Sequence, residues 1–310
     1  MSNVLIIKHG SLGDLIQANG AMEDIKNTFK DSKVFLLTTG PYIDLMSHCP
    51  YLDSVIMDKR LPRWNLFYLL KLKKLLSKFN FTHVFDLQNS SRTKFYQKYL
   101  LNKSKWSNTE SSLETGQNKK DFEKEPVLER MKIQLEKSGV IPKKTNSIDL
   151  SWSLINLNRF IRQYTNNDYI LIFPFCSKKH RKKKWPYFRS LVNQIKERYE
   201  NKYSVLIAPG PDEIKNSSNF NAKVVLDNGK SVNLQTLISL ISNSKFIISN
   251  DTGPAHIASH LDKKGLVLFG SHTSPKKVSI ENTNFKAITV KNLNDLTADN
   301  VMQKITNFLD

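Results

Sequence analysis

The sequence predicts an α/β protein with two domains, each built on a parallel β-sheet. Short apolar runs alternate with helical patterns along the whole chain. This alternation is typical of right-handed βαβ units whose sheet is covered by helices on both faces. A length of 310 residues exceeds what one hydrophobic core usually organises. The hydrophobic content of 39% is ample for folded domains and excludes a disordered polymer.

The first half predicts four strands, each followed by a helix. Residues 4–7 form an uninterrupted apolar run, as expected of a strand buried on both faces, and a helix begins at Leu15. The other strand–helix pairs are predicted at 34–38 and 42–47, at 54–57 and 66–77, and at 82–86 and 93–101. Residues 107–124 lack periodicity and are expected to form a mobile loop. A helix at 125–138 is expected to end at Gly139.

The second half restarts the alternation after a linker at residues 140–153. We therefore expect an N-terminal domain at 1–150 and a C-terminal domain at 151–310. The strands of the second domain are predicted at 169–173, 205–208, 224–226, 246–248, 265–269 and 286–290. Its helices are predicted to open at Trp185-Pro186, to span 234–241, to begin at Pro254, and to span 297–309. The last helix is a candidate for packing back on the N-terminal domain.

The charge balance points to a partner rich in phosphate. The chain holds 47 Lys and Arg against 28 Asp and Glu, a formal charge of +19. Such a balance suits nucleic acid, an anionic membrane face or a phosphorylated glycan. Two cysteines are too few for a disulfide framework or a zinc site and indicate a reducing compartment. With neither a signal-peptide pattern nor a run of about 18 apolar residues, the expected place is the cytoplasm, soluble or peripherally attached.

The most informative stretch is residues 246–258, where a strand, a tight turn and a helix start follow one another. Gly253 is expected to be the N-cap, with Pro254 at the first helical position. A helix N-terminus binds phosphate through free N–H groups and the positive end of the helix dipole. Asp251, Thr252 and His256 add an acceptor, a hydroxyl and an imidazole. The alternative is an ordinary βα connection with good capping.

A second strand–turn–helix spans residues 4–18. Gly10 and Gly13 allow a ligand to approach the backbone, but the GxxG spacing is not the GxGxxG dinucleotide fingerprint. Asp14 stands near the helix start, where it is either a capping residue or, at the edge of a cleft, a general base. Glu213 similarly follows a predicted strand, either as a cap or as a partner for ribose hydroxyls. The loop at 270–275 is also expected at a cleft.

Two segments concentrate the positive charge. Residues 59–106 contain twelve Lys or Arg and one acid, Asp86. The helix at 66–77 is amphipathic, so its basic face is predicted either to contact phosphate or lipid headgroups or simply to be solvated. Arg60, Arg63 and Arg92 are predicted phosphate contacts because the guanidinium fork binds anions in bidentate fashion. Residues 178–184 hold six Lys or Arg between a strand end and a helix, where one lysine would suffice for a pyrophosphate.

Four motifs, in the right order, resemble glycosyltransferase family 9, the heptosyltransferases of lipopolysaccharide core assembly. They are KHGSLGD at residues 8–14, Ser177 with KKWP at 183–186, GPDE at 210–213, and SNDTGPAHIA at 249–258. The resemblance covers essentially the whole chain. It implies the GT-B architecture, in which two Rossmann-like domains face across a cleft. It also implies a donor that is typically ADP-L-glycero-β-D-manno-heptose, and transfer that inverts the anomeric centre without a metal.

The resemblance also implies roles for individual residues. Asp14 looks like the base that deprotonates the acceptor hydroxyl, and Lys183 like the lysine that holds the diphosphate, with Lys182 and Lys184 as alternatives. The remaining donor contacts implied are Ser177, Glu213 at the ribose, and Asp251, Thr252, Gly253 and His256 around the sugar and phosphates. Apart from the resemblance, the expected acceptor contacts are Lys8, Arg60, Arg63 and Arg92.

No metal, nucleic acid or further cofactor is expected. The chain has no DxD carboxylate pair in a suitable loop. His256 and His260 stand at i and i+4, but Ile257 replaces the glutamate of an HExxH zinc motif. The expected partners are a nucleotide-sugar, a phosphorylated lipid-linked glycan and the anionic inner face of the cytoplasmic membrane. The competing hypotheses are a basic nucleic-acid-binding protein and a catalytically inert GT-B relative.

Overall fold

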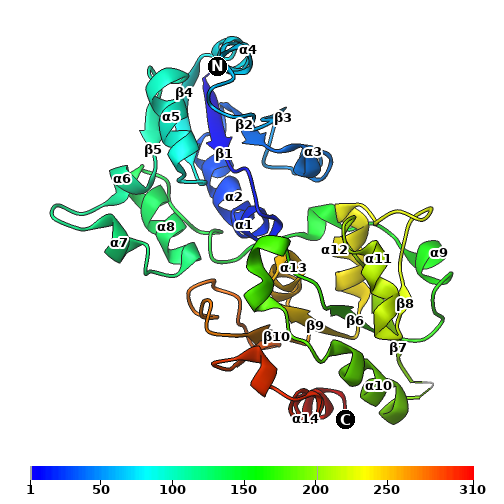
Figure 1. Cartoon of the computed structure of the whole chain (residues 1–310). Coiled ribbons are helices and arrows are strands. Elements are labelled where there is room, and N and C mark those ends of the chain that lie inside the picture. Colours follow the sequence, from blue (N-terminus) through cyan, green and yellow to red (C-terminus); the bar gives the residue numbers. More distant parts are fainter. Residues whose placement is uncertain (1, 201) are drawn as a thin grey trace. The chain divides into compact units, whose positions relative to one another are not determined.

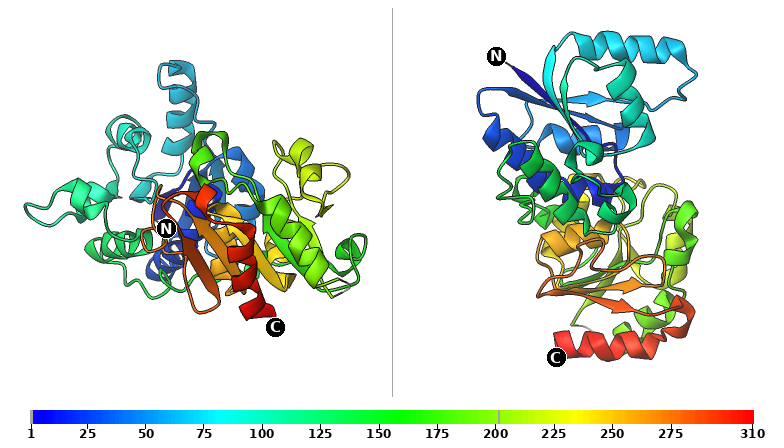
Figure 2. Two further views of the ribbon diagram at one scale, coloured as in Figure 1. Left: turned by 60° about the horizontal axis from the view of Figure 1, so that its bottom comes forward. Right: turned by 90° about the vertical axis from the view of Figure 1, so that its left-hand side faces the viewer.

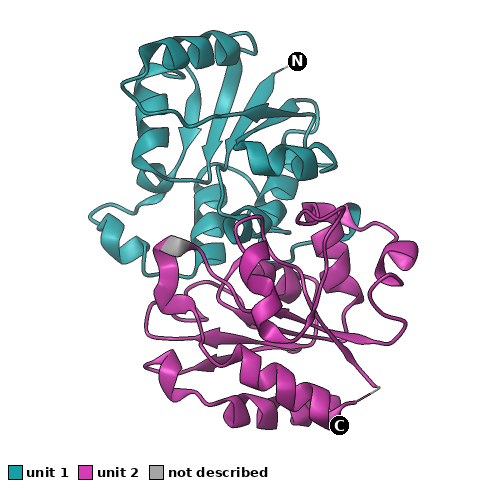
Figure 3. Cartoon of the chain, turned by 45° about the vertical axis from the view of Figure 1, so that its right-hand side comes forward, with its two compact units in different colours: residues 1–152 teal, residues 153–310 magenta. Residues whose placement is uncertain are grey.

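The computed structural model describes residues 2–200 and 202–310, apart from the side chain of Lys178. The chain divides into two compact units, Met1–Trp152 (unit 1) and Ser153–Asp310 (unit 2), as Figure 3 shows. Each unit contains a parallel sheet with helices on its faces, so the predicted α/β class is confirmed.

The sheet of unit 1 has five parallel strands in the order β3-β2-β1-β4-β5 (Figure 1). They are β1 Asn3–Ile7, β2 Lys33–Thr38, β3 Ser54–Met57, β4 Phe81–Asp86 and β5 Lys105–Ser107. The chain leaves β1 to one side through β2 and β3 and then returns to its other side at β4. The order therefore reverses between β1 and β4, and ligands bind in such a crevice at the carboxyl ends of the strands.

Helices cover both faces of this sheet. They are α1 Leu12–Gln17, α2 Asn19–Thr28, α3 Gly40–Ser47, α4 Leu66–Ser77, α5 Ser91–Tyr99, α6 Thr109–Ser112, α7 Lys119–Phe122 and α8 Val127–Lys137. Helices α4 and α5 lie on one face (Figure 2). They bury leucines and Tyr96 against alternate side chains of the strands. The interior is apolar because the strands are runs of β-branched and aliphatic residues, such as Val4–Ile7 of β1, all of them 0% exposed.

The sheet of unit 2 has six parallel strands in the order β11-β10-β9-β6-β7-β8. They are β6 Tyr169–Phe173, β7 Ser204–Ile207, β8 Lys223–Val224, β9 Phe246–Asn250, β10 Gly265–Phe269 and β11 Phe285–Thr289. The α-helices are α9 Asn158–Ile161, α10 Phe188–Arg198, α11 Ile214–Ser217, α12 Leu234–Asn243, α13 Gly253–His260 and α14 Ala298–Leu309. Short 3₁₀ segments are η1 Ser151–Ser153, η2 Lys178–Lys183, η3 Ser218–Phe220 and η4 Leu293–Asp295. Here the order reverses between β6 and β9.

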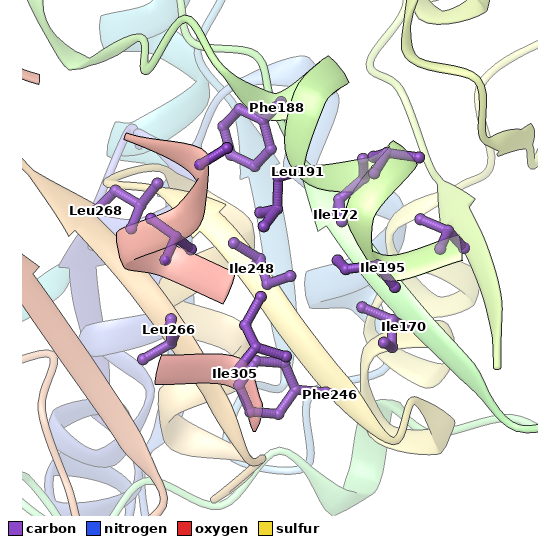
Figure 4. Close-up of a cluster of buried hydrophobic side chains, with 14 of the residues drawn as sticks. Ile170, Ile172, Phe188, Leu191, Ile195, Phe246, Ile248, Leu266, Leu268 and Ile305 are labelled. Carbon is purple, nitrogen blue, oxygen red and sulfur yellow. The ribbon is translucent and has the colours of Figure 1, made fainter. Parts of the chain in front are cut away.

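The core of unit 2 is shown in Figure 4, where isoleucines and leucines of β6, β9 and β10 meet Phe188, Leu191 and Ile195 of α10. The last helix, α14, adds Ile305 to this cluster and packs along α10. Its apolar face is therefore buried within unit 2, which corrects the expectation that it packs back on the N-terminal domain.

Three local expectations are also corrected. Residues 107–124 were expected to be a loop, but they contain α6 and α7, which Asn108 and Asn118 cap by accepting backbone N–H bonds. The N-cap of α13 is Thr252 rather than Gly253, which is the first helical residue. Helix α10 begins at Phe188, after Trp185-Pro186.

The beginning of the predicted linker is fixed to unit 1 by one buried carboxylate. Asp24 of α2 is 2% exposed and accepts backbone N–H groups from Lys143, Lys144 and Thr145 at 2.8–3.0 Å. The carbonyl of Lys144 also lies so close to Gly20 that an added Cβ would meet it at 2.1 Å. Residues 143–145 therefore belong to the packed body of unit 1.

Candidate functional site

The first group of predicted site residues lies at the carboxyl end of β1. The chain leaves β1 through Lys8, His9 and Gly10, and α1 begins after Ser11, its N-cap. Asp14 is the third helical residue, and its Oδ2 accepts the Ser11 backbone N–H at 2.8 Å and the Ser11 hydroxyl at 2.9 Å. The carboxylate therefore caps the helix. These two bonds also orient it, half-buried, at the edge of the sheet.

A charged cluster surrounds Asp14 in the crevice between β1 and β4. Lys8 is buried and donates from Nζ to the Leu87 carbonyl at 2.8 Å. Burial lowers the pKa of Lys8, and the negative charges of Asp14 and Asp86 oppose that shift. Burial raises the pKa of Asp86, whose Oδ1 accepts the N–H groups of Gln88 and Asn89.

Arg130 of α8 joins this cluster, although the sequence analysis did not select it. Burial lowers the pKa of its guanidinium, while Glu123 and Asp14 act in the opposite direction. Arg130 therefore lies within electrostatic reach of both Lys8 and Asp14. The only sequence signal was an arginine on the helix predicted at 125–138, and that signal becomes meaningful only when the topology brings α8 to this edge.

A buried polar network supports the loop after β1. His9 Nε2 lies 2.8 Å from Asp58 Oδ2, and both side chains are 0% exposed. The hydroxyls of Tyr68 and Tyr96 also donate to Asp58. Burial by itself would raise the pKa of Asp58, but the hydrogen bonds from His9, Tyr68, Tyr96 and the Arg60 N–H outweigh it and hold the pKa far below its ordinary value. Asp58 is therefore a buried anion that accepts hydrogen bonds from Tyr68, Tyr96 and the Arg60 N–H and lies beside His9.

The three predicted phosphate-binding arginines have different environments. Arg92 donates to the Tyr96 hydroxyl and to the backbone carbonyls of Arg60 and Leu61, at 3.0, 3.2 and 2.8 Å. Arg63 donates to the Ser91 carbonyl at 3.3 Å. Arg92 therefore holds the backbone of residues 60 and 61 in place through hydrogen bonds. The side chain of Arg60 is exposed. Acceptor contacts by Lys8, Arg60, Arg63 and Arg92 stay predictions.

The second group of predicted site residues meets at the β6/β9 crevice of unit 2. Asp251 follows β9 and is 2% exposed. Lys183, at the end of η2 after β6, places Nζ 2.6 Å from Asp251 Oδ2. Lys182 and Lys184 are exposed, so among the three lysines left open by the sequence Lys183 is the one directed into this crevice.

Two histidines complete the surroundings of Asp251. His256 Nε2 lies 3.9 Å from Asp251 Oδ1, and His272 Nε2 lies 3.1 Å from Oδ2. The His272 ring stacks on Phe269 with centroids 5.8 Å apart and a 12° interplanar angle. Sequence reasoning placed the 270–275 loop at this edge but did not select His272. The missed signal was a histidine three residues after a buried strand end.

Asn250 is a further residue that the sequence analysis passed over. Its side chain is fully buried at the end of β9, where Oδ1 accepts the Trp185 N–H at 3.0 Å and Nδ2 donates to the Phe175 carbonyl at 3.4 Å. Asn250 therefore holds both ends of the basic segment that carries Lys183. The segment is the kinked 3₁₀ stretch η2, which these two bonds attach to β9 and which has Lys183 at its last position.

The N-terminal tip of α13 offers fewer free backbone donors than the sequence predicts. Pro254 has no N–H, and the N–H groups of Ala255 and His256 donate to the Thr252 carbonyl at 3.0 and 3.4 Å. The Thr252 hydroxyl makes no capping bond to the helix. An anion at this tip would therefore rely on the Gly253 N–H, the helix dipole and the Lys183 ammonium.

Ser177 and Glu213 lie on separate loops of unit 2. Ser177 is exposed and caps η2 through its carbonyl, which accepts the His180 N–H at 2.9 Å. Glu213 is the N-cap residue of α11, but its side chain makes no capping bond to that helix, and Oε2 instead accepts the Gly210 N–H at 2.8 Å. Burial, together with the charge of Asp212, raises the pKa of Glu213. Within residues 2–200 and 202–310, neither side chain forms a hydrogen bond to Asp251.

The described side chains include no cluster of three or more His, Cys, Asp or Glu that could hold a metal ion. Among the described helices, none combines the length and the hydropathy that a bilayer span requires. Each unit thus carries its own polar edge. The edge of unit 1 is built on a carboxylate, Asp14, and the edge of unit 2 on a lysine–carboxylate pair, Lys183 and Asp251.

Comparison with known proteins identifies one family model that matches the chain and several solved structures that share its fold. The family model described as glycosyltransferase family 9 (heptosyltransferase) matches residues 69–306. The structure of Escherichia coli heptosyltransferase WaaC with ADP is 17% identical at a TM-score of 0.72, covering 98% of this chain and 99% of that one. The structure of Escherichia coli ADP-heptose lps heptosyltransferase II is 15% identical at a TM-score of 0.75, and the match covers 100% of this chain and 98% of that one.

A glycosyl transferase family 9 protein from Veillonella parvula is 14% identical at a TM-score of 0.76, covering 99% of this chain and 97% of that one. Comparison with curated protein sequences gives no match. At these identities the solved structures show a shared fold. The match to the family model rests on the sequence itself and includes Lys183, Glu213 and the 251–256 loop.

Proposed function

This chain belongs to glycosyltransferase family 9, the heptosyltransferases, and from that membership we propose that it transfers a heptose or a related sugar from an ADP-sugar to a phosphorylated lipopolysaccharide-core acceptor. Its fold is the GT-B architecture of two parallel-sheet α/β domains, and it is a glycosyltransferase. The donor, the acceptor and the inverting, metal-independent course of the reaction are the parts that we propose.

The Lys183–Asp251 pair at the tip of α13 carries the donor half of the proposal. A sugar-nucleotide leaving group carries a diphosphate whose charge grows as the glycosidic bond breaks. An ammonium within 2.6 Å of a carboxylate beside a helix N-terminus can move to that diphosphate and stabilise it without a metal. Escherichia coli heptosyltransferase WaaC has structures with ADP and with ADP-2-deoxy-2-fluoro heptose, which supports an ADP-linked donor.

We assign the remaining donor contacts by the same reasoning. Thr252 has a hydroxyl that the helix does not use, and His256 presents an imidazole beside Asp251. Asp251 would then remain to orient Lys183 and His272 and to accept sugar hydroxyls. In this proposal Glu213 holds the ribose, because a half-buried carboxylate with one oxygen bound to the Gly210 N–H can accept hydroxyl donors through its other oxygen.

The acceptor half of the proposal rests on Asp14. The Asp14 carboxylate takes the proton of the acceptor hydroxyl while that oxygen forms a bond to C1 of the sugar. The bond between C1 and the diphosphate oxygen breaks on the opposite face, and ADP leaves with the electron pair. A single displacement of this kind inverts the anomeric centre. Lys8 and Arg130 supply positive charge beside Asp14 that suits a phosphorylated acceptor.

The test combines a ligand panel with the removal of divalent metal ions. ADP-heptose, UDP-sugars and GDP-sugars are compared by thermal shift, because a specific ligand stabilises the folded state by mass action. Transfer is then followed by ADP release with EDTA present. ADP-heptose is expected to give the largest shift and EDTA to leave turnover unchanged. A larger shift with a UDP- or GDP-sugar, or activity that EDTA abolishes, would refute the donor or the metal-independent course.

We also propose that the enzyme works at the inner face of the cytoplasmic membrane. A lipid-linked core acceptor would be presented there, and the excess of Lys and Arg suits an anionic surface. Cell fractionation tests this proposal. The protein is expected in the membrane fraction at low salt and in the supernatant after a high-salt wash, because electrostatic attachment is screened.

A further inference from the structure

Unit 1 exposes a concentrated apolar tip at the start of α4. Trp64 is 81% exposed, Leu66 67%, Phe67 89% and Leu70 65%. Seven of the twelve large hydrophobic side chains that are exposed among the described residues fall between Met57 and Leu75. A soluble surface tolerates scattered apolar residues, but a concentration of this kind marks an interaction site.

These side chains lie together because of the helix period. Leu70 follows Phe67 by three residues and Leu66 by four, so all three share the outer face of α4. The opposite face buries Leu69, Leu72 and Leu76 against the sheet. Trp64 stands directly before the helix, where its carbonyl accepts the Leu66 N–H at 3.0 Å. The buried leucines of α4 therefore supply its contacts with the core of unit 1, and the exposed apolar residues of the tip are not part of that core.

The support beneath the tip is well anchored. Asn65 caps α4 by accepting the Tyr68 N–H at 3.0 Å. Arg92 holds the carbonyls of Arg60 and Leu61, and Asp58 accepts the Arg60 N–H at 2.7 Å and the Tyr68 hydroxyl. The tip is thus presented by a hydrogen-bonded loop and a capped helix, which lowers the entropic cost of ordering it against a partner.

The charge around the tip has one sign. Residues 59–78 contain seven Lys or Arg and no Asp or Glu. Lys71, Lys73, Lys74 and Lys78 are exposed on α4 or at its end. Within the described part of the chain, the salt bridges do not include any of these seven cations. The charge is therefore available to an anionic partner.

We propose that the tip of Trp64, Leu66, Phe67 and Leu70 inserts into the interface of an anionic lipid bilayer while the lysines of α4 contact the headgroups. Tryptophan and phenylalanine beside a cluster of lysines is the composition of membrane-surface helices. A protein partner would be expected to bring carboxylates to this face, whereas an anionic bilayer satisfies the apolar tip and the lysines with one surface. This inference rests on the proposed function, in which the acceptor is embedded in such a membrane.

The test uses the full chain with vesicles of phosphatidylethanolamine and phosphatidylglycerol, and with vesicles of phosphatidylcholine alone. The triple variant Trp64→Ser, Phe67→Ser, Leu70→Ser is compared with a control that changes three exposed apolar residues elsewhere: Ile141→Ser, Leu154→Ser and Ile155→Ser. Cosedimentation of the wild type with the anionic vesicles is expected, and the tip variant should lower the partition constant at least about tenfold. The control should match the wild type.

A second pair of variants separates insertion from charge. Lys71→Gln with Lys74→Gln should weaken binding to the anionic vesicles about tenfold, whereas Lys286→Gln with Lys304→Gln in unit 2 should not. Trp64 fluorescence, isolated as the difference between wild type and Trp64→Phe, should be quenched by lipids brominated on the acyl chain. Wild-type protein that ignores anionic vesicles, or a tip variant that binds as well as the control, would overturn the proposal.

Two further readouts keep this inference distinct from the proposed function. ADP-heptose binding and transfer to a delipidated acceptor in solution should be unchanged in the tip variant, while transfer to acceptor in vesicles should fall. If the wild type binds the anionic vesicles but turns over no ADP-sugar, the proposed function is refuted and the membrane-docking proposal is supported. A wild-type dimer that the tip variant converts to monomer, without any vesicle binding, would assign the tip to self-association and refute the membrane proposal.

Discussion

The tips of α1 and α13 are made by the same strand–turn–helix element and differ in charge. Each helix follows the strand at the reversal point of a parallel sheet. The α1 tip carries an acid within its first turn, Asp14, which occupies the Ser11 N–H. The α13 tip has no acid in its first turn, and the carboxylate just before it, Asp251, is paired with Lys183.

The difference teaches how one element can serve two chemistries. A carboxylate at a helix tip uses the local donors itself and repels phosphate, so the α1 tip suits a neutral hydroxyl that must lose a proton. A tip with a hydroxyl and a nearby ammonium suits a diphosphate. The predictions below alter one tip at a time and are ordered from the largest expected effect to the smallest.

Replacing the acid of the α1 tip should give the largest loss. Asp14→Asn keeps an oxygen that can accept from Ser11, so we expect stability to change by less than about 1 kcal/mol. The base is lost, and kcat should fall about 100- to 10,000-fold with the Kd for ADP unchanged. A turnover assay measures kcat, and calorimetric titration measures the Kd for ADP. The exposed Asp44→Asn serves as the control, and a kcat within about tenfold of the wild type would refute the role of Asp14.

The buried network beneath the α1 tip should carry the largest effect on stability. Asp58→Asn leaves His9, Tyr68 and Tyr96 with a neutral partner in a site that is 0% exposed, so we expect a loss of about 3 kcal/mol in urea unfolding. The matched change Asp53→Asn, at a partly exposed pair with Lys26, should cost less than about 1 kcal/mol. Equal losses for the two variants would contradict this assignment.

The same carboxylate predicts a pH dependence of stability. The pKa of Asp58 in the folded protein lies below its ordinary value of 3.8. Its contribution is therefore fully present above that value and is lost as the pH falls from about 5 toward the folded pKa. The wild type should lose stability faster than Asp58→Asn on acidification below about pH 5. Parallel curves for the two proteins would exclude Asp58 as a source of acid sensitivity.

How far the sequence predicts these two edges depends on the range of the interaction. Apolar strand runs and the residues after them are local signals, so the longer strands and the positions of Asp14 and Asp251 follow from the sequence. The three-residue strand β5 was missed, and the sequence left Lys182 and Lys184 open beside Lys183. The one-turn helices α6 and α7 were missed because a segment of four residues has no period to detect. Their capping asparagines alone do not distinguish a helix from a turn.

Contacts between distant segments could not be predicted. The sequence does not show that His9 meets Asp58, since this requires β1 to lie beside β2 and β2 beside β3. Arg130 and His272 join their sites for the same reason, through the placement of α8 and of the loop after β10. Arg92 shows the same limit. Its fork geometry predicts phosphate binding, but the sequence could not show that the fold also directs it to the backbone carbonyls of Arg60 and Leu61.

Removing the ammonium at the α13 tip should mainly weaken the binding of the nucleotide-sugar donor. Lys183→Ala deletes the cation beside Asp251 and leaves a carboxylate facing the proposed diphosphate. A charge-assisted contact contributes about 2 kcal/mol, so the Kd for ADP should rise about thirtyfold. Lys182→Ala and Lys184→Ala change exposed neighbours and should have little effect. If one of these controls lost more affinity than Lys183→Ala, the diphosphate contact would move to that lysine.

The smallest expected effect tests whether the cap of α13 is reserved for a ligand. The Thr252 hydroxyl makes no capping bond and only long contacts of 3.3 Å to Asn250 O and Ser249 Oγ. Thr252→Val should therefore cost less than about 0.5 kcal/mol of unfolding free energy, while Ser90→Ala, which removes a real cap from α5, should cost about 1 kcal/mol.

If the Thr252 hydroxyl instead serves the donor, Thr252→Val should raise the Kd for ADP about fivefold, the value of one modest hydrogen bond. Ligand affinity would then be more sensitive than stability at α13, and the reverse would hold for Ser90. Calorimetric ADP titration and urea unfolding on the same two variants measure both quantities. A destabilised Thr252→Val with unchanged ADP affinity would make Thr252 an ordinary cap and remove the chemical distinction between the two helix tips.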